Sequence, residues 1–267
     1  MSAAKRLLRH AVKRLLPPGM GLRIRTARHL KVGPAELRLL RTMRGDGDFI
    51  DVGANEGFWA YVGSRRFRHV HAFEPDQALA EHIAKALPSN VVVHQVALSD
   101  HEGQAELLTP VFSGERVHSR ASLEPTANDT PTHTTQKVPL RTLDSFNFTG
   151  VSALKIDVEG HEAATLAGAR ETIKRERPVM IVEIEERHHP GTSEKIIADV
   201  CELGMKCFYL RGGKLVPFTP GEIETLQAKP PSGFDFSDER SYVNNFIFIP
   251  EEQEQAVVKQ LNGGLSA

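Results

Sequence analysis

The sequence predicts an α/β fold in which a mostly parallel β-sheet is covered by helices on both faces. From about residue 49 onward, apolar runs typical of buried strands alternate with helical patterns, the order that produces such a sheet. The chain has 267 residues, of which 40% are hydrophobic, enough for one large domain with elaborations or for two small ones. No apolar run reaches the ~18 residues that a membrane-spanning helix needs.

The elements are expected in the following order. A helix over 5–16 is broken by the Pro- and Gly-containing segment 15–21, and the next helical stretch includes an amphipathic part at 33–43. Strands are expected at 49–54, 69–75, 91–98, 136–146, 151–159, 178–186, 206–218 (a hairpin around Gly212 and Gly213) and 243–250. Helices are expected at 57–66, 76–87 (with Asp76 as N-cap), 161–176 and 192–204. Residues 109–135 are rich in Ser, Thr, Pro and Gly and are expected to form a long loop.

Charge divides the chain unevenly. Residues 1–44 contain twelve Lys and Arg and one acidic residue, a charge of +11, whereas the remainder contains 21 basic and 33 acidic residues, a charge of −12. The helix expected at 5–16 is amphipathic and basic, so it can lie on an anionic membrane surface, contact nucleic acid, or pack on the acidic body. We therefore treat 1–35 as a basic N-terminal helical segment, 36–250 as the main domain and 251–267 as a C-terminal helical tail.

A glycine-containing loop follows the first expected strand. In a sheet of this kind, ligands bind outside the carboxyl ends of the strands, and Gly53 and Gly57 allow the backbone to turn sharply and approach a ligand closely. The segment 51–57 lacks the Gly-x-Gly-x-x-Gly pattern of dinucleotide-binding folds. Its pattern, built on Asp51, Gly53, Asn55 and Gly57, resembles the first motif of class I S-adenosylmethionine methyltransferases, in which the carboxylate meets the ammonium end of the cofactor.

Two further strand ends are typical of a nucleoside site. Glu74 ends the second strand about twenty residues after the glycine loop, where a carboxylate can accept both ribose hydroxyls of either NAD or S-adenosylmethionine. Polar groups around Ala97–Ser99, at the end of the third strand, would flank an adenine ring, although Ser99 can equally well cap a helix.

The fourth and fifth strands end in acidic residues. The strand at 151–159 is apolar at first and charged only from Lys155, so Asp157 and Glu159 should reach the carboxyl edge of the sheet beside the glycine loop. The alternative is that these acids cap the following helix. The fifth strand repeats the pattern with Glu183 and Glu185.

Taken together, the segments FIDVGANEG, FEP, TLDSF, LKIDVEGHE, LAGA, RPVMIVEIEE and NNFIFIP resemble the FkbM family of methyltransferases over residues 36–250. The resemblance implies a Rossmann-like class I methyltransferase domain with a seven-stranded sheet and an antiparallel last strand. It also implies S-adenosyl-L-methionine as cofactor and O-methylation of a sugar, glycan or small-molecule acceptor.

Methyl transfer to a hydroxyl also requires removal of a proton, for which Asp157, Glu159 and His161 are candidates. His161 has the most suitable unperturbed pKa, ~6.5, but it lies past Gly160, where its ring can instead cap the helix. We expect no metal, although Asp157, Glu159 and Glu183 could supply oxygen ligands to a divalent ion.

Several alternatives remain at this stage. They are an RNA methyltransferase that uses the basic N-terminus, a dinucleotide oxidoreductase, and a nucleoside-binding module without activity. The acidic body disfavours a nucleic-acid partner, and the missing dinucleotide fingerprint disfavours the oxidoreductase. The absence of a secretory signal and the two isolated cysteines, Cys201 and Cys207, favour a cytoplasmic protein, with the basic N-terminus as a possible contact to the inner membrane surface. The oligomeric state is left open.

Overall fold

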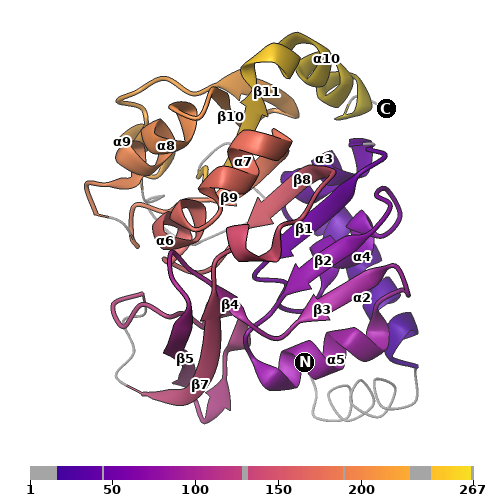
Figure 1. Ribbon diagram of the computed structural model, residues 1–267, viewed down its shortest axis with the longest axis vertical. Helices are drawn as coiled ribbons and strands as arrows, with labels where there is room; N and C mark the ends of the chain where they lie inside the picture. The colour runs from indigo at the N-terminus through magenta and orange to yellow at the C-terminus, as the bar shows by residue number, and fades with distance from the viewer. Residues whose placement is uncertain (1–16, 44, 128–131, 189, 229–241, 266–267) are drawn as a thin grey trace.

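A computed structural model describes residues 17–43, 45–127, 132–188, 190–228 and 242–265, so the basic helix expected at 5–16 lies outside the described residues. The main sheet has the strand order β11-β10-β12-β9-β8-β1-β2-β3 (Figure 1). Its strands are β1 (Asp48–Val52), β2 (Val70–Phe73), β3 (Val91–His94), β8 (Val151–Ile156), β9 (Val179–Glu183), β10 (Met205–Arg211), β11 (Lys214–Pro217) and β12 (Asn245–Pro250).

The pairing of these strands confirms a mostly parallel sheet with an antiparallel last strand. β3, β2, β1, β8 and β9 run parallel to one another, and β12 lies antiparallel between β9 and β10. The expected count of seven strands is wrong, because β11 adds an eighth at the edge. β11 folds back on β10 through the expected turn at Gly212 and Gly213, both of which have positive φ.

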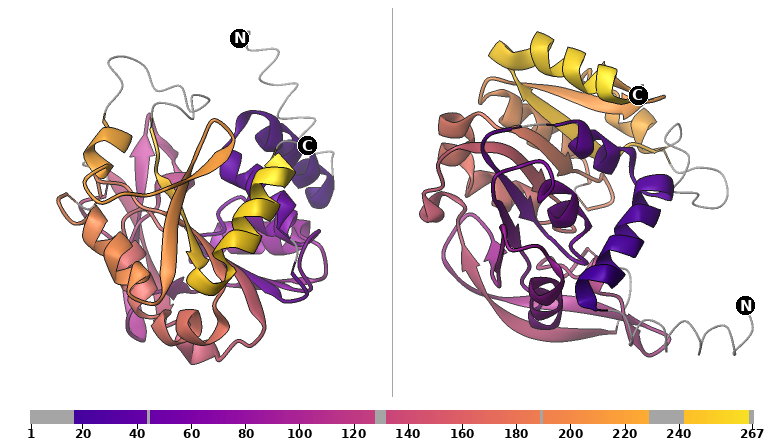
Figure 2. Two further views of the ribbon diagram at one scale, coloured as in Figure 1. Left: turned by 90° about the horizontal axis from the view of Figure 1, so that it is seen from above. Right: turned by 90° about the vertical axis from the view of Figure 1, so that its right-hand side faces the viewer.

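Helices cover both faces of the main sheet (Figures 1 and 2). Side chains of α3, α4, α5 and α10 join the apolar cluster on one face, and α2 contacts α4 and α5 there. Side chains of α6, α7, α8 and α9 join the cluster on the other face. The helices are α2 (Pro18–Val32), α3 (Ala35–Thr42), α4 (Phe58–Gly63), α5 (Gln77–Ala86), α6 (Glu162–Ala167), α7 (Arg170–Glu176), α8 (Ser193–Cys201), α9 (Ile223–Leu226) and α10 (Glu254–Leu265). The expected cap of α5 is confirmed, since Asp76 accepts a hydrogen bond from the backbone N–H of Leu79.

A second, smaller sheet includes both ends of the segment 109–135, which was expected to be a loop throughout. Its strand order is β4-β7-β5-β6, and it extends below the main sheet in Figure 1. Its strands are β4 (Ala97–Leu98), β5 (Gly103–Phe112), β6 (Glu115–Arg116) and β7 (His133–Arg141). The strand expected at 91–98 is accordingly divided, because β3 pairs with β2 whereas β4 pairs with β7. A short 3-10 helix, η1 (His118–Arg120), follows β6.

The single helix expected at 161–176 is also wrong, because the chain forms α6 and α7 with a break around Gly168 and Ala169. Gly168 lies against the backbone of Ser99, and a Cβ atom at this position would stand 1.9 Å from the Ser99 carbonyl oxygen. The close approach holds the junction between α6 and α7 against the chain that leaves β4.

In the described part of the chain, no helix combines the length and apolar character that crossing a lipid bilayer requires.

Replacing Gly168 with Ala should lower the free energy of unfolding by about 1–3 kcal/mol, because the new methyl group overlaps a backbone carbonyl that cannot move away freely. Gly263→Ala in α10 is the matched control: nothing lies within 4 Å of its Cβ position, so the change should be neutral or stabilise by up to about 1 kcal/mol. Urea denaturation of both variants measures the difference, and equal stabilities would contradict the close packing at Gly168.

Candidate active site

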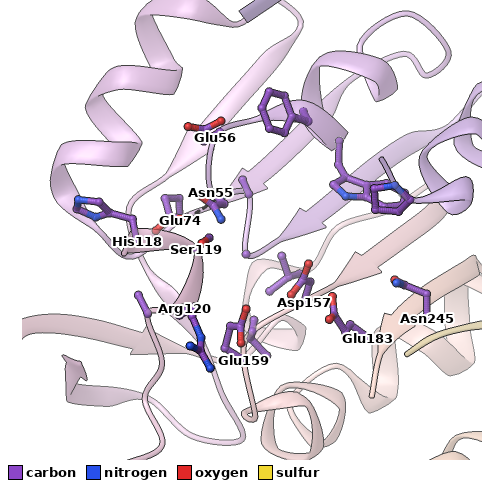
Figure 3. Close-up of a pocket in the computed structure, with 18 of the residues that line it drawn as sticks. Asn55, Glu56, Glu74, His118, Ser119, Arg120, Asp157, Glu159, Glu183 and Asn245 are labelled. Atoms are coloured by element: carbon purple, nitrogen blue, oxygen red, sulfur yellow. Dashed lines mark hydrogen bonds between the residues drawn. The ribbon is translucent and has the colours of Figure 1, made fainter. Parts of the chain in front are cut away.

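A cavity of about 1390 Å³ lies at the carboxyl edge of the parallel strands (Figure 3). The ends of β1, β2, β8 and β9 and the residues before β12 line one side of it, and α2, the start of α3 and η1 line the others. Figure 3 shows the side chains of Asp157, Glu159 and Glu183 gathered in this space, with Asn55 and Ser119 across from them. The chain therefore brings side chains from both of its sheets to one cavity.

The glycine loop after β1 is pressed against the end of β8. Gly53 has φ +80°, and a Cβ atom there would stand 1.8 Å from the carbonyl oxygen of Asp157, so glycine is required for the loop to lie this close. Asn55 is also left-handed, with φ +47°. Its backbone N–H donates to Glu74 Oε2 at 2.7 Å, while the N–H of Asp76 donates to Oε1 at 2.9 Å. These two bonds fix the Glu74 carboxylate beside the loop.

Burial of the Glu74 carboxyl raises its pKa to about 7, although the two backbone hydrogen bonds oppose the shift. Each carboxylate oxygen keeps acceptor capacity beyond the one backbone hydrogen bond that it receives.

The residues expected to bind the cofactor divide into two groups. Gly53, Asn55, Glu74, Ala97 and Asp157 line the cavity. Three others do not: Asp51, Gly57 and Ser99. Gly57 precedes α4 in a left-handed conformation, and Ser99 lies behind the cavity wall, where its hydroxyl hydrogen-bonds to His161 and Asp100.

Asp51 is completely buried below the loop rather than in the cavity. It lies on β1 directly opposite Lys155 of β8. The N–H of Ala60 approaches it, but no donor among the described residues reaches hydrogen-bond geometry with either carboxylate oxygen. Burial raises the pKa of Asp51 to about 7, against the opposing charge of Lys155.

Lys155 connects this buried carboxylate to the cavity. Its ammonium group is buried, lies 3.3 Å from Asp157 Oδ2 and stands over the ring of Trp59, with 5.2 Å to the ring centroid. The Asp157 side chain is 30% exposed and faces the cavity. The contact with Asp157 gives the buried ammonium group of Lys155 a charged partner, without which its burial would be costly.

The backbone of Glu159 is left-handed, with φ +49°, a conformation that is uncommon for residues other than glycine. Two contacts hold this turn: the hydroxyl of Ser122 donates to the carbonyl oxygen of Glu159 at 2.5 Å, and the carboxylate of Glu162 accepts from the N–H of Gly160 at 3.1 Å. Ser122 follows η1 and forms an isolated β-bridge with Leu108 of β5, so the small sheet helps to fix the end of β8.

The Glu159 carboxylate lies 3.4 Å from both Arg187 and His188. Burial raises its pKa above the usual value, although the contact with His188 opposes the shift.

The end of β9 supplies a second pair of carboxylates. Burial, with the nearby charge of Asp157, raises the pKa of Glu183 well above its usual value. Burial would also raise the pKa of Glu185, but hydrogen bonds from Arg187 at 2.5 and 3.1 Å lower it to about 2. Asn244 donates to Glu183 at 2.6 Å. The pair is thus divided into one carboxyl that favours its neutral form and one that favours its charged form.

His161 lines the cavity, but its ring is held by protein partners on both sides. Nδ1 lies 2.7 Å from Glu124 Oε1, and Nε2 lies 2.9 Å from the hydroxyl oxygen of Ser99. With both nitrogens engaged, the imidazole has no free position from which to take a proton from an acceptor, so this geometry argues against His161 as the general base. Across the described residues, no group of three or more His, Cys, Asp or Glu side chains is arranged to hold a metal ion.

Sequence reasoning did not identify several residues that line the cavity, among them Trp59, the three residues of η1, Arg187, and Asn244 and Asn245. Asn244 and Asn245 could have been found, because an antiparallel strand starts at the edge where its parallel neighbours end. The η1 residues could not, because they reach the cavity only through the fold of the small sheet.

Replacing Asp51 with Asn tests the burial of this carboxyl. Its folded-state pKa is raised, so its contribution to stability is complete below the unfolded pKa, near 3.8, and is lost as the pH rises through about 7. Asn cannot ionise, so the stability of the variant relative to the natural protein should be greater at pH 8 than at pH 5, by on the order of 1–3 kcal/mol. Denaturant unfolding at both pH values measures this, and a pH-independent difference would contradict the raised pKa.

Comparison with known proteins agrees with this arrangement. The family model described as "Methyltransferase FkbM domain" matches residues 51–209, more than half of the chain. No curated protein matches the chain.

Three solved structures are similar to the chain. A methyltransferase FkbM from Methylobacillus flagellatus KT is 14% identical, with a TM-score of 0.48 over 77% of this chain and 44% of that one. A precorrin-6y C5,15-methyltransferase from Geobacter metallireducens GS-15 is 10% identical, with a TM-score of 0.42 over 80% and 87% of the two chains. An rRNA methylase from Streptococcus thermophilus is 9% identical, with a TM-score of 0.41 over 81% and 93%.

The present chain thus spans less than half the length of the first of these structures. The family match covers the glycine loop, Glu74, the acidic end of β8 and the whole of β9. The chain therefore belongs to the methyltransferase FkbM domain family, whose methyl donor is S-adenosyl-L-methionine.

Proposed function

We propose that this protein transfers a methyl group from S-adenosyl-L-methionine to a hydroxyl group of a sugar, a glycan or another small molecule. The observation that carries this proposal is the pair of carboxylates, Asp157 and Glu159, at the cavity beside the loop that we assign to the donor. A hydroxyl acceptor must lose a proton as its oxygen is methylated, and a carboxylate within reach can accept it.

The residues of the cavity fit the donor. Glu74 is fixed by two backbone hydrogen bonds and keeps further acceptor capacity, as two ribose hydroxyls require. Gly53 and Asn55 border the cavity with a close-lying backbone, and Ala97 adds a small side chain at the end of β4. Asp157 is the carboxylate available to the positively charged methionine end of the donor, a role that Asp51 cannot take from its buried position.

When bound, S-adenosylmethionine supplies a methyl group that is already activated by its sulfonium. The residues of the chain then have two tasks: to hold donor and acceptor in line, and to take up the acceptor's proton. We assign the second task to Glu159. Burial raises its pKa and so makes it a stronger base than an exposed carboxylate, while Arg187 and His188 hold its position.

The acidic side chains of the cavity favour some methyl acceptors over others. Three carboxylate side chains at the cavity, Asp157, Glu159 and Glu185, would repel the phosphates of an RNA strand. A neutral hydroxyl compound meets no such repulsion. This supports a sugar or small-molecule acceptor over RNA, and a turnover assay distinguishes either from a module that only binds the donor.

For donor binding, Glu74→Gln should weaken S-adenosylhomocysteine by about tenfold or more, because an amide accepts only one of the two ribose hydroxyl bonds well. Glu81→Gln, on the exposed face of α5, is the control and should leave the affinity unchanged. Isothermal titration calorimetry measures both variants. Equal affinities of the Glu74 variant and the natural protein would refute the assigned donor site.

For catalysis, an acceptor is first found by incubating sugars and other hydroxyl compounds with donor and enzyme, and detecting the added methyl by mass spectrometry. Glu159→Gln should then lower kcat by at least about a hundredfold and leave donor affinity near normal, because only the proton acceptor is removed. In the natural protein, kcat should rise with pH as Glu159 ionises, above the usual range for a glutamate.

His161→Ala is the comparison, and it should retain most of the rate, since both ring nitrogens are occupied by protein partners. A Glu159 variant with full activity, or a His161 variant as slow as the Glu159 one, would exclude Glu159 as the base.

A further inference from the structure

One face of α2 is exposed and carries apolar and basic side chains but no acidic one. Met20, Ile24 and Val32 are 49%, 56% and 60% exposed, which makes them three of the few large apolar side chains at the surface of the described residues. The remaining exposed side chains of α2 are Arg23, Ala27, Arg28 and Lys31. At 100° per residue, these seven positions fall on one side of the helix. We call them the α2 face.

The other side of α2 is anchored to the domain. Leu22 and Thr26 are buried, and the helix contacts both α4 and α5. Both panels of Figure 2 show α2, in indigo, on the outside of the molecule. The α2 face is therefore a fixed surface of the folded domain.

The α2 face also borders the cavity. Arg28 and Val32 belong to the face and to the lining of the cavity at the same time. A surface that binds the α2 face would consequently lie beside the entrance to the proposed active site.

We propose that the α2 face docks the protein on an anionic lipid surface. An interfacial helix needs apolar side chains that enter the boundary between headgroups and acyl chains, and basic side chains that contact anionic headgroups. Met20, Ile24 and Val32 supply the first, and Arg23, Arg28 and Lys31 supply the second. The absence of an acidic side chain from all of α2 removes the repulsion that such a surface would otherwise exert.

Other occupants fit the face less well. An RNA strand would contact the three cations but would gain nothing from the exposed aliphatic side chains, and none of the seven side chains of the α2 face is an aromatic ring on which a base could stack. A second copy of the chain would bring three cations against three cations. Residues 5–16 of this chain carry Lys5, Arg6, Arg9, Lys13 and Arg14, so this segment is repelled by the face for the same reason.

This inference goes beyond the proposed function and does not depend on it, because binding to lipid is measured without methyl transfer. The test is co-sedimentation of the full chain with vesicles of phosphatidylcholine alone and of phosphatidylcholine with an equal share of phosphatidylglycerol. The natural protein should bind the anionic vesicles and not the neutral ones.

Two changes on the face should weaken binding, each by about fivefold or more: Ile24→Glu, which puts a charge where an apolar group should enter, and Lys31→Glu, which reverses a charge. Two changes elsewhere are the controls: Val92→Glu, an exposed apolar residue on β3, and Lys214→Glu, an exposed lysine on β11. The controls should bind as the natural protein does. Calorimetry with S-adenosylhomocysteine verifies that each variant is folded.

Four results would overturn the proposal. The first is that the natural protein does not bind anionic vesicles, and the second is that the two face variants bind them as well as the natural protein does, which would assign lipid binding to another segment. The third is that the face variants lose binding to an RNA oligonucleotide but not to vesicles. The fourth is that the natural protein is a dimer that the face variants convert to monomers in the absence of lipid.

Discussion

The close approach of β1 and β8 at their carboxyl ends is the constraint on which the site depends. A glycine at position 53 allows the loop after β1 to lie against the carbonyl oxygen of Asp157, at a distance that no side chain permits. This contact fixes the position of Asn55, whose backbone N–H donates to Glu74. It also fixes the position of Asp157, which faces the cavity immediately beside the loop. The parallel sheet supplies the two strand ends, and the missing Cβ brings them together.

The second organising feature is the excess of carboxylates around this contact. Asp51, Asp157, Glu159, Glu183 and Glu185 lie at or just below the cavity, and the cations among them are Lys155 and Arg187. The protein reduces the cost of so much buried negative charge in two ways. Lys155 and Arg187 pair with some of the carboxylates, and burial raises the pKa of Asp51 and Glu183 so that they favour their neutral forms. A positively charged methyl donor would further balance the charge that remains.

The sequence predicted the part of this site that local patterns encode. Asp157 and Glu159 follow an apolar strand, so a period of two residues was enough to direct them to the carboxyl edge, and Glu74 was found from its distance to the glycine loop. The same local pattern did not reveal where the side chain of Asp51 lies. It lies two residues before Gly53, inside the strand, and only the register with Lys155 reveals that it points into the packed face rather than the cavity.

Longer-range features were out of reach for a related reason. Residues 109–135 were expected to form a loop because of their Ser, Thr, Pro and Gly content, yet both ends of this segment belong to strands, and β5 and β7 pair over eight residue positions. Through that pairing Ser122 comes to hold the backbone of Glu159, and η1 comes to border the cavity. His161 was considered as a base from its ordinary pKa, and its partners Glu124 and Ser99 could not be foreseen, because they are 37 and 62 residues away in sequence.

The most direct test of this account is a crystal structure of the protein with S-adenosylhomocysteine. The account predicts ribose hydroxyls within hydrogen-bond distance of the Glu74 carboxylate, and the sulfur atom directed toward the space between Asp157 and Glu159. A nucleoside bound away from Glu74, or a sulfur atom directed away from both carboxylates, would contradict it.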